Sequence, residues 1–154
     1  MWIIIVVAIL AYIVYNFSKD TRNVINEPFE IKFNHLLSIL NKLCNNQGKL
    51  DTINDMKYIF SNPSDVFGAK FIFIYTGDNL RITRKQITID GNDEFSMNFS
   101  SISKAFMDEN KQIEILATFL VEHNTKSSDF TDTSLTKEER INTVIKGFNQ
   151  IITR

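Results

Sequence analysis

Histidine and cysteine side chains are common metal ligands and nucleophiles, and this chain has two histidines and one cysteine. His35 and His123 lie far apart in the sequence, and neither has a cysteine, a second histidine or a carboxylate at the spacing of a metal-binding motif. A catalytic thiolate at Cys44 needs a neighbouring base, but His35 falls on the opposite face of the same predicted helix. We therefore expect no metal site, no cofactor and no enzyme activity.

One acidic segment has oxygen-bearing side chains at alternate positions, as a calcium-binding loop does. It contains Asp90, Asn92 and Glu94, but Phe95 and Ser101 occupy the sixth and twelfth positions, where an EF-hand requires Gly and Glu. The five glycines of the chain are too scattered for a phosphate-binding loop. The segment is therefore predicted to be a solvated hairpin turn.

The charges of the chain are nearly balanced. It has 17 Lys and Arg against 18 Asp and Glu over 154 residues, and a main role in binding nucleic acid would need a clear basic excess. The densest basic cluster consists of Arg81, Arg84 and Lys85, with Lys70 nearby. It is interpreted either as a patch that attracts anionic lipid or a partner, or as a solvated strand edge whose charge discourages unwanted pairing.

The amino-terminal segment is the strongest pattern in the sequence. Residues 1–17 are apolar or aromatic at every position except Asn16. A helix of this length measures about 25 Å, close to the ~30 Å hydrocarbon core of a bilayer. Aromatic rings near both of its ends suit the two membrane interfaces. The side chains expected to anchor it are Trp2, Ile5, Ile9, Tyr12 and Tyr15.

A cleaved signal peptide, a buried helix and an interfacial helix each fit this segment less well than a membrane anchor does. A signal peptide needs a basic start and a small-residue cleavage site. A buried core helix is disfavoured because the uninterrupted apolar surface stands at the extreme terminus, and an interfacial helix needs a polar face. An uncleaved signal-anchor is therefore favoured. Lys19 and Arg22 follow it, so the positive-inside rule places the rest of the chain in the cytoplasm. Residues 18–28 read as a linker that ends at Pro28.

The remaining residues, 29–154, are predicted to form one small α+β domain. Residues 71–75 form a continuous apolar run that predicts a strand buried on both faces. Apolar and polar residues then alternate over 80–83, 86–90 and 95–99, which indicates a meander of three or four antiparallel strands in all. Ile82 and Ile87 differ in parity, which predicts a bulge or tight turn at Arg84–Lys85. Apolar residues with helical spacing predict two helices before the meander and two after it, over 29–44, 51–60, 102–124 and 136–152.

The aromatic content suggests a way of contacting a partner. Phe95 and Phe99 on the last strand, and Phe130 in a polar loop, are either core residues or an exposed docking patch. A strong anchor joined to a domain without catalytic residues favours a single-pass membrane protein that serves as a non-enzymatic subunit or adaptor. Its partners would be membrane lipid, through the amino-terminal helix, and a protein of unknown identity. The alternative is a regulatory or immunity-type protein that inhibits a toxin or an enzyme at the membrane.

Overall fold

The computed structural model describes residues 9–13, 15, 28–65, 68–88, 91–100, 102, 108–127 and 134–153. These residues form an α+β fold, as predicted, with a five-stranded antiparallel sheet whose strands follow one another in chain order. The strands are β1 (Lys49–Asn54), β2 (Lys57–Ser61), β3 (Lys70–Tyr75), β4 (Asn79–Thr88) and β5 (Gly91–Ser100). The helices with defined bounds are α2 (Phe29–Lys32), α3 (Asn34–Leu43), α4 (Glu109–Ser127) and α5 (Lys137–Ile152).

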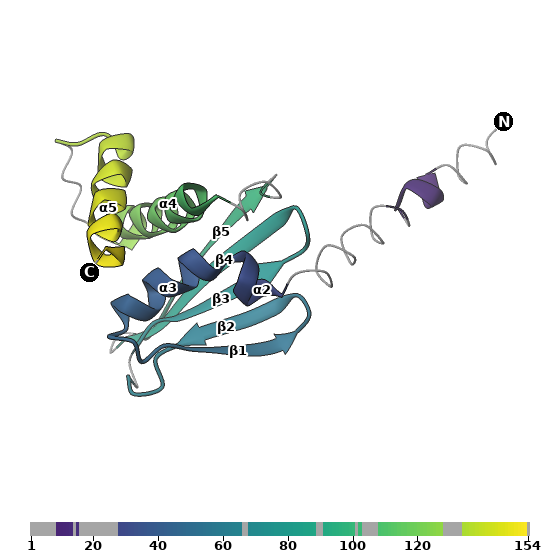
Figure 1. Ribbon diagram of the computed structural model, residues 1–154, viewed down its shortest axis with the longest axis horizontal. Coiled ribbons are helices and arrows are strands. Elements are labelled where there is room, and N and C mark those ends of the chain that lie inside the picture. The colour runs from purple at the N-terminus through teal and green to yellow at the C-terminus, as the bar shows by residue number, and fades with distance from the viewer. Residues whose placement is uncertain are drawn as a thin grey trace.

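The hydrophobic core lies between one face of the sheet and the helices. Helices α2 and α3 lie across this face, and α5 packs on the outside of α4 (Figure 1). Aromatic rings join the two layers: Phe29 of α2 stacks on Tyr58 of β2 with ring centroids 4.2 Å apart. Phe119 of α4 lies 6.3 Å from Phe71 of β3 and 5.2 Å from Phe95 of β5. All the helices that contact the sheet through these rings therefore cover the same face.

The predicted helix over residues 51–60 is wrong, because this segment contains most of the β1–β2 hairpin. Its apolar residues fit both a helical and an alternating pattern. In the structure Tyr58 and Phe60 face the core, while Ile59 between them lies on the other face. The Asn54 side chain closes the turn by accepting a hydrogen bond from the Met56 backbone N–H at 3.0 Å. The meander consequently has five strands rather than three or four.

The bulge or turn predicted at Arg84–Lys85 is also wrong. Strand β4 runs through these residues with an unshifted register to β3 and to β5. Ile82 and Ile87 differ in parity because they lie on opposite faces of one strand, and Ile82 is fully buried whereas Ile87 is 55% exposed. The last turn of the meander comes earlier than predicted, since Gly91 already pairs with Thr88.

The other three helical predictions, over 29–44, 102–124 and 136–152, hold with shifted boundaries. The first helix breaks at Phe33 into α2 and α3. The buried side chain of Gln112 spans this break: its Nε2 donates to the Lys32 carbonyl at 3.0 Å, and its Oε1 accepts from the Leu36 backbone N–H at 3.3 Å. Helix α4 begins at Glu109 rather than near residue 102.

Helix α5 has capped ends. Thr136 and Glu139 form the predicted capping box at its start. At its other end the Lys42 ammonium group of α3 donates to the carbonyls of Ile151 and Ile152, at 2.8 Å and 3.1 Å. A lysine in this position also suits the negative end of the helix dipole. Together the two caps fix both the length of α5 and its position against α3.

The capping box makes the stability of α5 depend on pH. Hydrogen bonds from the Thr136 backbone N–H and hydroxyl hold the pKa of the Glu139 carboxyl below its ordinary 4.5. Since this pKa is lower in the folded state, the stabilisation is present above about pH 4.5 and is lost as the pH falls through the folded pKa. We expect Glu139→Gln to reduce the loss of α5 helicity on acidification, measured by circular dichroism. Parallel acid titrations of the two proteins would contradict this expectation.

The amino-terminal helix predicted as a membrane anchor falls largely outside the described residues. Residues 9–13 and 15 are helical, and Ile9, Tyr12 and Tyr15 are 53%, 68% and 66% exposed. Trp2 and Ile5, together with Lys19 and Arg22, lie outside the described residues. Within the described part of the chain, no helix has both the length and the apolar character needed to cross a bilayer.

Candidate interaction site at the edge of the sheet

The two edge strands of the sheet differ in how well they are protected from pairing with another chain. Strand β1 has six residues, begins with Lys49 and shifts register between Thr52 and Asn54. Strand β5 has ten residues, pairs with β4 without a shift and contains no Lys, Arg or Pro. Short length, bulges, lysines and prolines are the usual protections of an edge. Strand β5 therefore presents the less protected edge.

The charges of β5 are confined to its first half. Glu94 forms an ion pair with Lys85 of β4 at 2.7 Å. Asp93 lies 3.4 Å from the Arg84 guanidinium and 3.1 Å from the His123 imidazole. The second half, residues 95–100, carries no charged side chain. An added strand could pair along this half without meeting a charge on β5.

A pocket of about 350 Å³ lies between this uncharged half and helix α4, and we call it the β5 groove. Met97 and Phe99 line it from the strand, and Ile115 and Thr118 line it from the helix. Lys111 and Glu114 also line the groove, and they neutralise each other at 2.7 Å. The β5 groove therefore combines apolar side chains, to which Ile102 also contributes, with polar ones that include Asn98 and Ser100. Its two charges neutralise each other, so the groove suits an uncharged side chain.

The structure separates the three predicted docking aromatics. Phe99 is half-buried and lines the β5 groove. Phe95 packs into the core instead, edge-on to His123 at 5.5 Å, with the Lys126 ammonium group 5.1 Å from its ring centroid. Phe130 lies outside the described residues. Of the three, Phe99 alone is placed at the candidate site, where Met97 accompanies it.

The predicted basic cluster is divided between the two faces of the sheet. Arg84 faces the helices, where its guanidinium lies 2.7 Å from His123 Nε2 and also bonds the Gln86 side chain. Arg81 and Lys85 alternate with it and lie on the opposite face. A single patch made of all three residues therefore does not form. Arg81 and Lys85 instead share their face with Lys70, which pairs with Lys85 in the register.

The cluster of Arg84, Asp93 and His123 was not apparent in the sequence, because its members come from β4, β5 and α4. His123 Nε2 lies 2.7 Å from the Arg84 guanidinium and 3.1 Å from the Asp93 carboxylate. The other ring nitrogen, Nδ1, lies 3.3 Å from the Asn124 side-chain oxygen. His123 is only 5% exposed. The cluster thus joins the β4–β5 hairpin to the end of α4.

The remaining candidates for chemistry are placed unfavourably. Burial raises the pKa of the Cys44 thiol, and the charge of Asp65 raises it further, so the reactive thiolate is disfavoured. The His35 imidazole lies beside the Glu109 carboxylate, with Nδ1 3.5 Å from Oε1, rather than beside this thiol. Within the described residues, no three metal-binding side chains come together.

No known protein family, no curated protein and no solved structure significantly matches this chain.

Proposed function

We propose that the chain is a single-pass membrane-anchored interaction protein, a non-enzymatic subunit or adaptor of a membrane-associated complex. Residues 1–17 would form the anchor, and the α+β domain would recognise the partner in the cytoplasm. The observation that supports recognition by this domain is the less protected edge of β5 beside the β5 groove. An edge of this kind binds an extended segment of another protein as an additional strand.

The β5 groove suggests what the partner segment looks like. Backbone groups of the added strand would pair with β5, which supplies affinity without requiring a particular sequence. Six residues, 95–100, correspond to about 20 Å of strand. Every second side chain of the added strand would point toward α4 and fill the groove beside Met97 and Ile115. The proposed partner is therefore an extended segment with at least one apolar residue and no charge at the positions that face α4.

Blocking the β5 groove tests this proposal. Thr118 lines the groove from α4 and is half-buried, so Thr118→Arg places a long charged side chain where the partner's residue would go. We expect at least about a tenfold loss of partner binding, equivalent to ~1.4 kcal/mol. Thr143→Arg makes the same change at an exposed position of α5 and should leave binding unchanged.

The measurement is a pull-down of the tagged full-length protein in mild detergent, with residues 18–154 as a second bait. A stoichiometric partner that is lost with Thr118→Arg and kept with Thr143→Arg supports the groove as the binding site. Retention of the partner by both variants rejects it. Loss of the partner from the 18–154 bait would show that residues 1–17 contribute to assembly beyond tethering.

A further inference from the structure

The sheet face opposite the helices has an apolar centre with basic residues around it, and we call it the open face. Ile59 of β2 pairs with Ile72 of β3, and Ile74 follows on the same strand. All three isoleucines are half-buried, although no helix of the described residues packs on them. Four basic side chains lie around them on β2, β3 and β4: Lys57, Lys70, Arg81 and Lys85. On β1 the ion pair of Lys49 and Asp51 lies on the same face, with Asp51 opposite Ile59.

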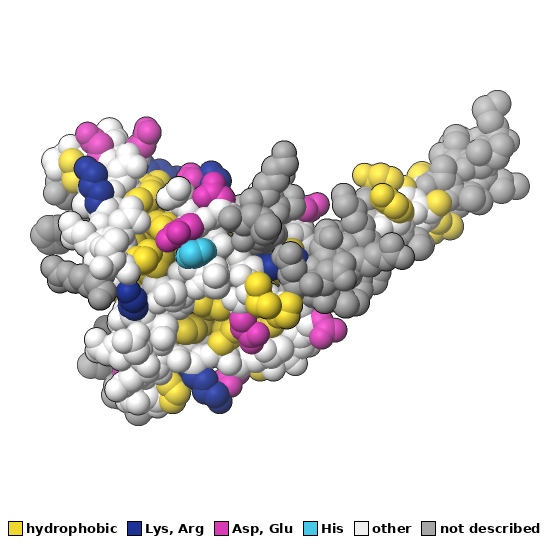
Figure 2. Space-filling view, in the orientation of Figure 1, with side chains coloured by type: hydrophobic (Ala, Val, Ile, Leu, Met, Phe, Trp, Pro, Cys, Tyr) yellow, Lys and Arg dark blue, Asp and Glu magenta, His cyan; other side chains and the backbone are white. Residues whose placement is uncertain are grey.

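The basic residues of the open face are only partly neutralised. Lys85 is paired with Glu94 at 2.7 Å. Lys57, Lys70 and Arg81 have no carboxylate within 4.0 Å among the residues that the structure describes. By contrast, acidic and basic side chains are interspersed on the helical side of the molecule (Figure 2). The open face therefore has more basic than acidic side chains, because Asp51 and Glu94 are its acidic residues in the described strands and each already pairs with a lysine.

One cross-strand pair of side chains on this face destabilises the sheet. Lys70 and Lys85 stand directly opposite each other on β3 and β4. Like charges in directly opposed positions destabilise a sheet, and Glu94 neutralises only one of the two. Anions from outside the chain would offset this repulsion and would also neutralise Lys57 and Arg81. An anionic surface thus complements the open face in charge.

We propose that the open face rests on an anionic membrane surface, with its isoleucines at the interface and its basic side chains against lipid phosphates. This inference rests on the proposed membrane anchor. A linker of residues 18–28 spans less than about 40 Å even when fully extended, so an anchored domain stays within reach of the bilayer. Each basic residue near an anionic leaflet then contributes roughly fivefold to binding.

A second copy of the chain suits the open face poorly, because two such faces would bring basic residues together. An acidic protein offers the same charge as a lipid surface, but the proposed anchor keeps lipid permanently beside the domain at a high effective concentration. The observations therefore favour lipid, and the experiment below distinguishes the two.

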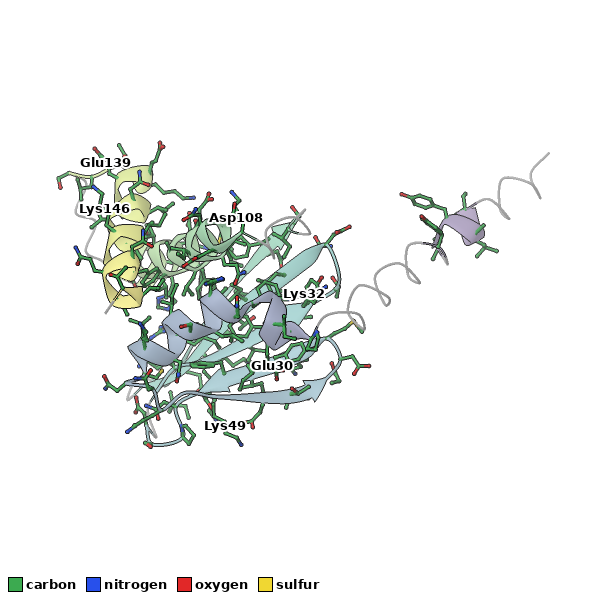
Figure 3. The ribbon with its side chains drawn as sticks, viewed as in Figure 1. Glu30, Lys32, Lys49, Asp108, Glu139 and Lys146 are labelled. Atoms are coloured by element: carbon green, nitrogen blue, oxygen red, sulfur yellow. The ribbon has the colours of Figure 1, made fainter. Side chains whose placement is uncertain are left out.

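The test measures how accessible the open face is when the full-length chain is inserted in nanodiscs. A cysteine is introduced by Ser61→Cys, two residues after Ile59 and on the same face of β2, in a Cys44→Ser background. The control is Lys146→Cys on α5, away from the sheet (Figure 3). Alkylation by a charged maleimide is compared between nanodiscs of phosphatidylcholine alone and nanodiscs that also contain phosphatidylserine.

We expect phosphatidylserine to slow alkylation of Ser61→Cys at least about fivefold and to leave Lys146→Cys unchanged. The protection should disappear in about 1 M salt, where the Debye length is about 3 Å. It should also disappear when Lys57, Lys70 and Arg81 are all replaced by glutamate. Equal rates in both nanodiscs would overturn the proposal. Protection that appears only when an acidic protein is added would likewise overturn it in favour of a protein partner.

The same samples separate failure of this inference from failure of the proposed anchor. If the chain does not co-elute with phosphatidylcholine nanodiscs after detergent removal, the anchor is wrong and the lipid proposal loses its premise. If it co-elutes but Ser61→Cys stays equally accessible with phosphatidylserine, the anchor stands and lipid docking is rejected.

Discussion

Replacing Gln112 with alanine is expected to lower the free energy of unfolding by about 3 kcal/mol. The Gln112 side chain is 1% exposed and satisfies two backbone groups where the first helix breaks, the Lys32 carbonyl and the Leu36 N–H. Alanine would remove both hydrogen bonds and leave a cavity in their place. Backbone groups that are buried without partners cost more than the bonds themselves contribute.

Urea unfolding of the parent and variant proteins measures this loss. Gln112→Glu keeps an oxygen acceptor for the Leu36 N–H but removes the donor to the Lys32 carbonyl, so it should also destabilise the fold. Asn110→Ala changes an exposed amide on the same helix and serves as the control, with an expected effect within about 0.5 kcal/mol. Equal stabilities of Gln112→Ala and Asn110→Ala would mean that the junction does not depend on this side chain.

A methyl group at Gly48 is expected to destabilise the fold by about 1–3 kcal/mol. The added Cβ would lie only 2.8 Å from Cε2 of Phe60 and still closer to its Cζ. This ring is 3% exposed and belongs to the core, so it has little room to withdraw. Moving the backbone instead would weaken the 3.0 Å hydrogen bond from the Gly48 N–H to the Asn41 side chain.

The helical glycine Gly147 provides a matched control for Gly48. A Cβ at Gly147 meets no atom within 4 Å beyond its immediate chain and helix neighbours. Because alanine is the better helix former, Gly147→Ala should stabilise α5 by up to about 1 kcal/mol. Opposite signs for the two substitutions in thermal unfolding are expected. In a Phe60→Leu background, Gly48→Ala should lower the free energy of unfolding by less than it does in the parent protein, because the smaller side chain removes the clash. If the two substitutions instead lower the free energy of unfolding additively, the contact with Phe60 is not the cause of the loss.

The sequence is most informative where one pattern excludes the others. Thr136 and Glu139 have the spacing of a capping box, and they form one. The segment of Tyr58 and Phe60 misleads because its apolar residues satisfy two periodicities, and pairing with β3 selects the strand. Ile82 and Ile87 differ in parity because one lies on the buried face and the other on the exposed face of the same strand. The prediction assumed that both isoleucines lie on the buried face, and only a bulge between them would allow that.

The candidate sites are harder to foresee because distant elements build them. An aromatic residue on a strand, such as Phe99, can be predicted from the sequence to contact a partner or the core. Thr118, which lines the β5 groove opposite it, lies in a helix whose sequence gives no sign of a binding role. Arg84 groups with Arg81 and Lys85 along the sequence, and only the continuous strand separates it from them. The meeting of Arg84 with His123 depends on how α4 lies over the sheet, which spacing along the chain does not encode.

The order of the strands has a consequence for how the chain folds as it leaves the ribosome. Each strand pairs with its neighbour in the sequence, so the sheet closes through short loops at low entropic cost. The hairpins can therefore form while the carboxyl-terminal helices are still being synthesised. The contact of Lys42 with the end of α5 joins residues more than a hundred positions apart, so it is among the last to form. Until then the nascent domain exposes part of its apolar core, and this interval is when it is most vulnerable to aggregation and proteolysis.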